Sequence, residues 1–453
     1  MKDLTQGSIV SHILNMAPPI VAGMVTIMIC QLVDLYFVAG LGEAAIAGVS
    51  AAGNLGFLIN GLMQVLGVGT VALIAHAVGR KDRADANLVF NQALGLAAAS
   101  GLLTWVIGAA LAGGYMRMVA ADEATVAAGT TYLLWFMPAL ALQFANQVVG
   151  AALRATGIVR PSMIVQAIAV AINIALAPVL ITGWGTGHAF GVAGAGLASS
   201  MAMLIAVLML WVYFRRLERY VGVDLAQLRP LLPQWRRIVD VGLPAGGEFA
   251  IIFMWMGVIY YALRDFGAAA QAGFGIGTRV LGLIQMPALA IALAAGPIAG
   301  QNFGAGNAAR VREAFTKAAV IATVVMIAFT ILAQWQPGLL LGGFADDPET
   351  IAVATLFLQM VSLNLVAQGF TFVCSSMFQG LGNTKPMLLS SGARLVTYAL
   401  PVLWLSARPG FRMEYVWYLS NLTTTLQAAL SLWLLRLEFR KRLAPLKSGL
   451  PAE

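Results

Sequence analysis

The sequence predicts an all-α integral membrane protein with twelve transmembrane helices in two pseudo-symmetric six-helix bundles. Three observations predict this fold. Of 453 residues, 60% are hydrophobic and only 10% are charged, a composition that fits no soluble globular class. Apolar stretches long enough to cross a bilayer follow one another along the chain. Identical residues also recur at one offset of 225 positions, which indicates an internal repeat.

Each predicted helix is an apolar window bounded by charged residues, Gly or Pro, because a bilayer core takes about 20 apolar residues of helix. The first six windows are Ile13–Val38, Ala51–Ala75, Leu88–Ala112, Ala128–Leu153, Ser162–Thr182 and Val192–Phe214. The second six are Ile238–Leu263, Ala270–Ala299, Ala314–Leu340, Ile351–Phe378, Leu388–Ser406 and Tyr415–Leu435. We therefore expect an N-terminal bundle over 1–214, a basic linker over 215–237, a C-terminal bundle over 238–436 and a tail over 437–453.

The loops differ in charge on alternate sides of the predicted helices. Loops after even-numbered helices hold most of the Lys and Arg, such as Arg80, Lys81 and Arg83, whereas the other loops are mainly acidic. Because Lys and Arg stay on the cytoplasmic side, the linker, the tail and both termini are predicted to be cytoplasmic, in a bacterial-type inner (plasma) membrane. The net charge of +8 then needs no nucleic acid partner.

The repeat suggests a transporter with a cavity between its halves. Its matched pairs are Pro19 and Pro244, Gly42 and Gly267, Gly48 and Gly273, Gln143 and Gln368, Gly157 and Gly382, and Pro161 and Pro386. Since each half has an even number of helices, the pseudo-two-fold axis should run along the membrane normal. A channel or sensor would need a continuous pore instead. The two cysteines and three histidines show no metal-ligand spacing, and no catalytic constellation is present, so neither an enzyme nor a cofactor is expected.

Three polar residues of the first half lie at similar predicted depth. Asp34 should lie about 9 Å from the outer end of its helix, Asn173 about 15 Å and Ser199 about 12 Å. An ionised side chain in the bilayer centre costs at least about 2.5 kcal/mol, so Asp34 should face a cavity, with Gln31 one turn earlier on the same face. The three could form one polar pocket; alternatively, Asn173 and Ser199 hold helices together.

Glu248 is the corresponding acid of the second half. It lies about 16 Å past Arg237, near the membrane middle, one turn after Pro244. It is either a working carboxylate or a permanent partner of a basic residue, for which Arg279 and Arg394 are available. Polarity and helix position also suggest residues of a substrate cavity: Gln31, Phe57, Asn60, Gln64, Gln143, Asn146, Gln285 and Gln368.

Several motifs resemble the multidrug and toxic compound extrusion (MATE) family over nearly the whole chain. The most specific is the string from Gly300 to Asn307, which reads GQNFGAGN. The others are Val33–Val38 after Pro19, Gly242–Pro244 before Glu248, Asn173–Pro178, Gly191–Ala195 and Gln379–Thr384.

The resemblance implies two six-helix bundles around a central cleft, and export of organic cations and other amphiphiles in exchange for protons or sodium. Asp34 matches the family's coupling acid, Asn173 a neighbouring polar ligand, Ser199 a hydroxyl position and Glu248 an acid of the second bundle. Ala177 stands where many members have a second carboxylate or an amide, and Gln368 stands where some sodium-coupled members have an acid. Sodium needs several hard oxygen ligands, so these two residues favour protons as the coupling ion.

The hypothesis that follows is a proton antiporter in which protonation of Asp34 moves its helix at a Pro18–Pro19 hinge and expels the substrate. A sodium-coupled drug antiporter and a lipid-linked precursor flippase of the same superfamily are the alternatives. A flippase should carry extra helices and a cationic cavity, whereas the central candidates here are acidic. We expect small organic molecules and the bilayer as partners, and a monomer.

Overall fold

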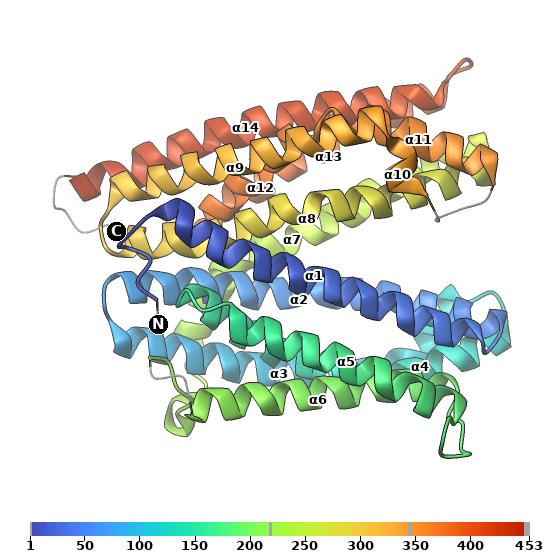
Figure 1. Ribbon diagram of the computed structural model, residues 1–453, viewed down its shortest axis with the longest axis horizontal. Coiled ribbons are helices and arrows are strands. Elements are labelled where there is room, and N and C mark those ends of the chain that lie inside the picture. The colour runs from blue at the N-terminus through green and yellow to red at the C-terminus, as the bar shows by residue number, and fades with distance from the viewer. Residues whose placement is uncertain (1, 217–219, 343–346, 448–453) are drawn as a thin grey trace. The chain divides into compact units, whose positions relative to one another are not determined.

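The computed structural model describes residues 2–216, 220–342 and 347–447, and its elements are all helices (Figure 1). Ten described helices are long and apolar enough to cross a bilayer, or eleven if one bent pair counts as a single span. The prediction of an all-α membrane fold is confirmed. Residues 217–219 of the predicted linker and 448–453 of the predicted tail lie outside the described residues.

The chain forms two compact units. Unit 1 comprises Pro19–Gly246 with Lys2 and Asp3, and unit 2 comprises Leu4–Pro18 and the chain from Gly247 onward. The helices up to the second unit are α1 (Ile9–Ala39), α2 (Glu43–Gly79), α3 (Arg83–Val119), α4 (Glu123–Ala155), α5 (Arg160–Thr182), α6 (Val192–Arg216), the 3₁₀ turn η1 (Leu225–Leu228) and α7 (Leu232–Leu263). Those that follow are η2 (Arg264–Phe266), α8 (Ala268–Gly304), α9 (Ala308–Trp335), α10 (Pro337–Leu341), α11 (Pro348–Ser362), α12 (Leu365–Gly380), α13 (Lys385–Ser406) and α14 (Met413–Lys447).

Two helices are divided between the units, a feature that the predicted bundles of residues 1–214 and 238–436 do not contain. The division in α1 falls between Pro18 and Pro19, and that in α7 between Gly246 and Gly247. The first part of α7 belongs to unit 1 because Gly242 and Gly246, which lack a Cβ, let its backbone approach Val65 of α2. The proposed hinge at Pro18–Pro19 thus coincides with a boundary between units, although α1 itself is one continuous helix.

The two units share one packing pattern, as the sequence repeat predicts. In unit 1, α4 packs against α2, α3 and α6, and α5 packs against α6. In unit 2, α12 packs in the same way against α8, α9 and α14, and α13 packs against α14 (Figure 1). The pair α11 and α12 therefore takes the place of α4.

Local backbone geometry repeats at the same offset of 225 residues. Gly42 and Gly267 have φ of 103° and 88°, and each precedes a long helix. Lys81 has a φ of 60° and corresponds to Gly306, with a φ of 76°, so the repeat retains a left-handed residue even where glycine is absent. The backbone conformation of these turns is thus the same in the two repeats, as is the order of the helices.

Helix capping follows the repeat as well. Asp122 accepts a hydrogen bond from the Thr125 N–H at 2.8 Å before α4, and Asp347 accepts one from the Thr350 N–H at 2.9 Å before α11. The Thr125 N–H and the Thr350 hydroxyl, respectively, are the main reason that the pKa of each carboxyl is below its usual value. The two caps mark the same point of each repeat.

The GQNFGAGN string holds the segment that leads into α1. Leu4, which is fully buried, donates its N–H to Gln301 Oε1 at 2.9 Å, and its carbonyl accepts from Asn302 Nδ2 at 3.1 Å. Arg310 donates to Asn302 Oδ1 at 3.0 Å and to the Gly7 carbonyl at 2.9 Å. These contacts bind the start of α1 to unit 2.

One predicted helix, Ile351–Phe378, is broken in the structure. It forms α11 and α12, which meet at a bend of 60° near residues 363–364, about halfway along the combined helix. The carbonyls freed at the bend accept hydrogen bonds from neighbouring helices: Met360 O from Asn421, Gln359 O from Gln334 and Ser362 O from Thr330. A break inside a membrane persists only where protein satisfies these groups, which is why hydropathy alone did not predict it.

The predicted helix Ala314–Leu340 is also interrupted. It ends as α9 at Trp335, and Pro337 begins the short α10. Proline disfavours helical geometry in the residue before it, and Gln336 has φ −137° and ψ 59°. Elsewhere the helices extend beyond the predicted apolar windows, because their polar ends continue past the bilayer core.

The last predicted span, Tyr415–Leu435, lies within α14, which is not among the described helices apolar enough to cross a bilayer by composition. The helix carries its polar side chains inward. Those buried are Ser420, Thr423, Thr424, Gln427 and Ser431, whereas Leu422, Leu426 and Trp433 are exposed. The low hydropathy of α14 thus comes from a polar stripe that faces protein, not lipid.

We expect Asn302→Ala to destabilise the protein, because the substitution leaves the buried Leu4 carbonyl and the Arg310 guanidinium each without one hydrogen-bond partner. A loss of about 1–3 kcal/mol is expected. Thermal unfolding of the purified protein in detergent measures it. Asn307→Ala is the matched control, since Asn307 is exposed and its side chain makes no capping hydrogen bond; equal effects of the two substitutions would contradict the proposed role of Asn302.

Candidate functional site

Asp34 of α1 lies in a small polar cluster inside unit 1. Cys30, one turn earlier, places its Sγ 3.9 Å from Asp34 Oδ2. Asn173 of α5 is almost fully buried beside it, and Ser199 of α6 is half-buried behind Asn173. The structure therefore brings together the three residues that the depth estimate grouped.

The Asn173 amide links the carboxylate to α6. In the amide orientation that the surrounding donors and acceptors favour, its nitrogen donates to Asp34 Oδ1 at 2.8 Å, while its oxygen accepts from the Ser199 N–H at 3.3 Å and the Ser199 hydroxyl at 3.1 Å. This orientation satisfies all of these groups, whereas the reverse would set two oxygens against each other. Three helices thus meet through one chain of hydrogen bonds that ends on the carboxylate.

An apolar cluster borders this site one helical turn farther along α1 and α5. It contains Val38 and Ala177, both with no exposed surface, packed with Ala45, Ile181 and Ala195. The Ala177 position is therefore filled by apolar contacts. Gln31, predicted to share the Asp34 face, is exposed.

Glu248, the acid of unit 2, lies in a second cluster built from α7, α13 and α14. Its Oε1 accepts from the Ser391 hydroxyl at 2.7 Å, and Ser391 Oγ accepts from Gln427 Nε2 at 3.1 Å. Gln427 Oε1 in turn accepts from Arg394 Nη1 at 3.3 Å, and the Arg394 guanidinium lies 4.8 Å from the ring centre of Trp255. Two neutral side chains thus separate the acid from the arginine.

The predicted cavity residues, Gln31 of α1 included, lie on five helices, and their role stays a prediction. On α2, Phe57 and Asn60 are exposed, whereas Gln64 accepts a hydrogen bond of 2.5 Å from Gln147 of α4. Asn146 of α4 donates to Gln166 of α5 at 3.5 Å. The remaining three, Gln143 on α4, Gln285 on α8 and Gln368 on α12, are half-buried.

The partners Gln147, Gln166, Ser391 and Gln427 were missed by sequence reasoning. Each is a single polar residue in an apolar window, and only its position on a helix facing another polar residue distinguishes it. For Gln427 a signal was present, because polar residues recur at helical spacing from Ser420 to Ser431. That spacing marks a buried polar stripe on α14.

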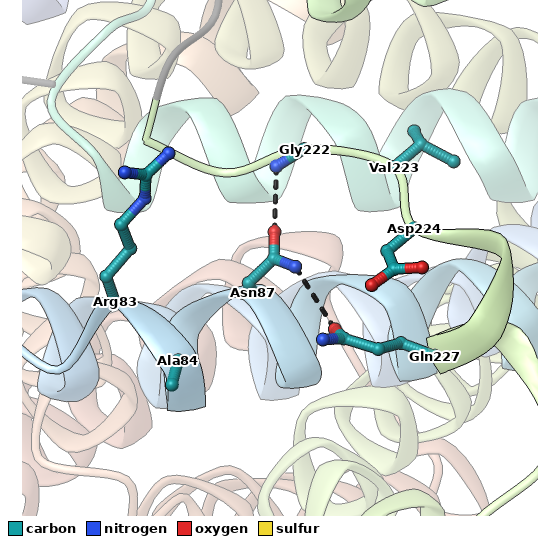
Figure 2. Close-up of a pocket in the computed structure, with 7 residues that line it drawn as sticks. All are labelled: Arg83, Ala84, Asn87, Gly222, Val223, Asp224 and Gln227. Atoms are coloured by element: carbon teal, nitrogen blue, oxygen red, sulfur yellow. Dashed lines mark hydrogen bonds between the residues drawn. The ribbon is translucent and has the colours of Figure 1, made fainter.

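A separate pocket of about 520 Å³ lies at the start of α3, outside the predicted site (Figure 2). Asn87 accepts from the Gly222 N–H at 2.8 Å and donates to Gln227 at 3.1 Å, as Figure 2 shows. Next to it, Gln92 accepts from the Leu231 N–H at 2.9 Å. The segment before α7 is therefore held by α3, much as unit 2 holds the segment before α1.

Two stretches of the chain, residues 19–179 and 244–405, match the model of the MatE family. They begin at Pro19 and Pro244, which are 225 positions apart, so each match covers one repeat. The chain belongs to the MatE family. This is a family of transporters, which confirms the predicted resemblance and the prediction that the protein is not an enzyme.

Proteins similar to this MatE-family chain include transporters that are named for different substrates. An FAD transporter of Shewanella oneidensis is 24% identical over 86% of both chains. The multidrug export protein MepA of Staphylococcus aureus is 26% identical over 85% of both. A solved structure of an outward-facing multidrug resistance MATE transporter of the MOP superfamily superposes with a TM-score of 0.89 at 23% identity, over 97% of both chains.

Adjacent serines of α6 should have separable roles. Ser199→Ala removes the hydrogen bond that the Ser199 hydroxyl donates to the Asn173 amide oxygen. Transport should therefore fall about fivefold, as expected for one hydrogen bond, while thermal stability changes little. Ser200 instead donates to the Trp135 carbonyl at 2.6 Å and accepts from the Ala139 N–H, so Ser200→Ala should mainly lower stability. Dye transport in vesicles and thermal unfolding together distinguish the two; a transport defect confined to Ser200→Ala would contradict the assignment.

Proposed function

We propose that this MatE-family protein is a proton-coupled antiporter that exports small organic, often cationic, compounds across a bacterial-type inner (plasma) membrane. The observation that carries the proposal is the Asp34 cluster, in which one intramembrane carboxylate is held by Asn173, itself held by Ser199. Intramembrane carboxylates in transporters commonly serve as proton relays. The similarity to a multidrug export protein supports organic compounds as the cargo.

The cluster supplies chemistry for a proton better than for sodium. Sodium is bound by several hard oxygen ligands, whereas a proton needs a single carboxylate oxygen. In this cluster Asn173 turns its N–H group toward Asp34 and its oxygen toward Ser199, so the amide offers the carboxylate a donor and not an oxygen ligand. Ala177 adds no further oxygen, because it is part of the apolar cluster.

Protonation of Asp34 changes the balance of hydrogen bonds in the cluster. The bond from Asn173 to an ionised carboxylate is charge-assisted, and it weakens when the carboxylate is neutralised. In the proposed cycle, α1 then shifts at Pro18–Pro19, and unit 1 loses its attraction for cationic cargo. Release of the proton to the cytoplasm restores the charge. Such coupling requires the proton and the cargo to bind the two conformations with different affinities.

Export of a flavin dinucleotide is a second candidate, favoured by the similarity to the FAD transporter over 86% of both chains. FAD carries a diphosphate, so its recognition would require cationic groups in place of a single acid. Competition of dye transport by FAD separates these cargo classes. Sodium-coupled drug export and flipping of a lipid-linked precursor are the remaining alternatives.

We expect Asp34→Asn to abolish dye uptake by proteoliposomes driven by a pH gradient, because the amide cannot take up and release the coupled proton. The assay uses ethidium, with a pH gradient and a sodium gradient imposed separately. Asp240→Asn is the matched control, since Asp240 is an exposed acid of unit 1 near the start of α7 that pairs with exposed Arg236 at 3.6 Å.

The gradients decide the coupling ion. Uptake driven by the pH gradient and lost only in Asp34→Asn would support the antiport proposal. Uptake driven by sodium alone would favour the sodium-coupled alternative, and pH-driven uptake that survives in Asp34→Asn would refute the role of Asp34. Absence of uptake under either gradient would leave the flavin and lipid cargoes as the candidates.

A further inference from the structure

Arg394 is an intramembrane cation with unused hydrogen-bonding capacity. It is the tenth residue of the 22-residue helix α13, about 14 Å from the helix start. A guanidinium has five N–H donors, yet the only hydrogen bond found for it among the described residues is the 3.3 Å bond to Gln427. Its Nε is buried without a partner, while the residue as a whole is only half-buried.

No ion pair neutralises this guanidinium within the part of the chain that the structure describes. The nearby acid, Glu248, instead accepts from the Ser391 hydroxyl. Because a charge inside a membrane is energetically costly, such residues are normally paired or exposed to water and ligands. A purely structural arginine would be expected to close directly on Glu248, but Ser391 and Gln427 stand between them.

The surroundings of Arg394 hold its guanidinium ready for a planar partner. Trp255 lies against it at 4.8 Å, which favours a flat orientation of the guanidinium over the ring. Gln427 is 95% buried within the polar stripe of α14, and it fixes one edge of the fork. An arginine whose plane is fixed in this way binds carboxylate or phosphate through two parallel hydrogen bonds.

A second arginine points to the same ligand chemistry. Arg279 is the twelfth residue of α8, also in unit 2, and it is exposed with no ion pair among the described residues. An exposed guanidinium about 17 Å into a membrane helix is costly against lipid and therefore faces a hydrated space. Arg279 therefore adds a second cation to the helices of unit 2.

We propose that unit 2 contains a subsite for the anionic group of a transported amphiphile, a carboxylate or a phosphate, which Arg394 recognises while stacked on Trp255. Glu248, which is connected to Arg394 through Ser391 and Gln427, is the internal anion that competes with the anionic group of the cargo for the Arg394 charge. The cargo would then include anionic or zwitterionic compounds as well as cations. This inference rests on the proposed transport function for its biological meaning, but the binding itself requires no ion coupling.

The test compares two probes that differ only in a phosphate, flavin mononucleotide and riboflavin. Their binding to the purified full-length protein, in nanodiscs of zwitterionic lipid, is measured by flavin fluorescence. The wild-type protein should bind the phosphorylated probe about tenfold more tightly, as expected for a charge-assisted bidentate contact. Equal affinities for the two probes would refute the subsite.

Three variants locate the preference. Arg394→Gln should bring the two affinities to about equal, whereas Glu248→Gln should increase the preference, because its amide removes the competing negative charge. Arg408→Gln is the matched control and should keep the wild-type ratio, since Arg408 also stacks on a tryptophan, Trp404 at 3.6 Å, but lies exposed after α13. An unchanged ratio of the two affinities in Arg394→Gln would overturn the proposal. A reduced preference for the phosphorylated probe in Glu248→Gln would also overturn it, and this second test does not depend on the folding of Arg394→Gln.

A lipid headgroup could offer the same phosphate chemistry. Adding phosphatidylglycerol to the nanodiscs should leave binding of flavin mononucleotide unchanged if the subsite serves a soluble cargo. Loss of binding would assign the site to lipid and overturn the substrate assignment. Failure of pH-driven ethidium uptake would count against the Asp34 mechanism only, because the flavin affinities are measured at equilibrium without a gradient.

Discussion

Inside a bilayer there is no water to pair with a polar group, and this constraint explains where the polar side chains at the bend and along α14 lie. The bend between α11 and α12 frees backbone carbonyls, and Thr330, Gln334 and Asn421 donate to them. The same need places the polar stripe of α14 toward protein, with leucines outward. Polar side chains in these helices therefore occur where a neighbouring helix supplies a hydrogen-bond partner. Polar side chains without such a partner are candidates for a functional role.

The repeat preserves geometry but not chemistry. At the offset of 225, the positions of Asp34, Asn173 and Ser199 are occupied in unit 2 by Ile259, Tyr398 and Thr424. Conversely, Gly23 and Ala169 of unit 1 stand where unit 2 has Glu248 and Arg394. Caps and glycine contacts are maintained because they determine the helix packing, whereas the charged sites diverged. Each unit thus has its own polar cluster on a common scaffold.

The polar clusters of unit 1 and unit 2 differ in which side chains contact their charged groups. In unit 1 a single carboxylate on α1 is linked to two further helices, α5 and α6, through Asn173 and Ser199. In unit 2 an acid and an arginine are kept apart by Ser391 and Gln427, so neither charge is fully satisfied by the other. The proposed proton coupling and the proposed anion subsite thus rest on two different arrangements of charge, one in each unit.

The sequence by itself determined the membrane class, the repeat and the grouping of Asp34 with Asn173 and Ser199. Hydropathy, loop charge and a constant offset are properties of the chain that need no contacts to be recognised, and depth along a helix follows from a fixed rise per residue. Only the tertiary structure decided that α1 and α7 are each divided between two units, that one predicted helix is broken at its middle, and that Glu248 bonds to Ser391 instead of an arginine. These features depend on which side chains meet across neighbouring helices, and helical periodicity constrains the face of a residue but not the partner that it will meet there.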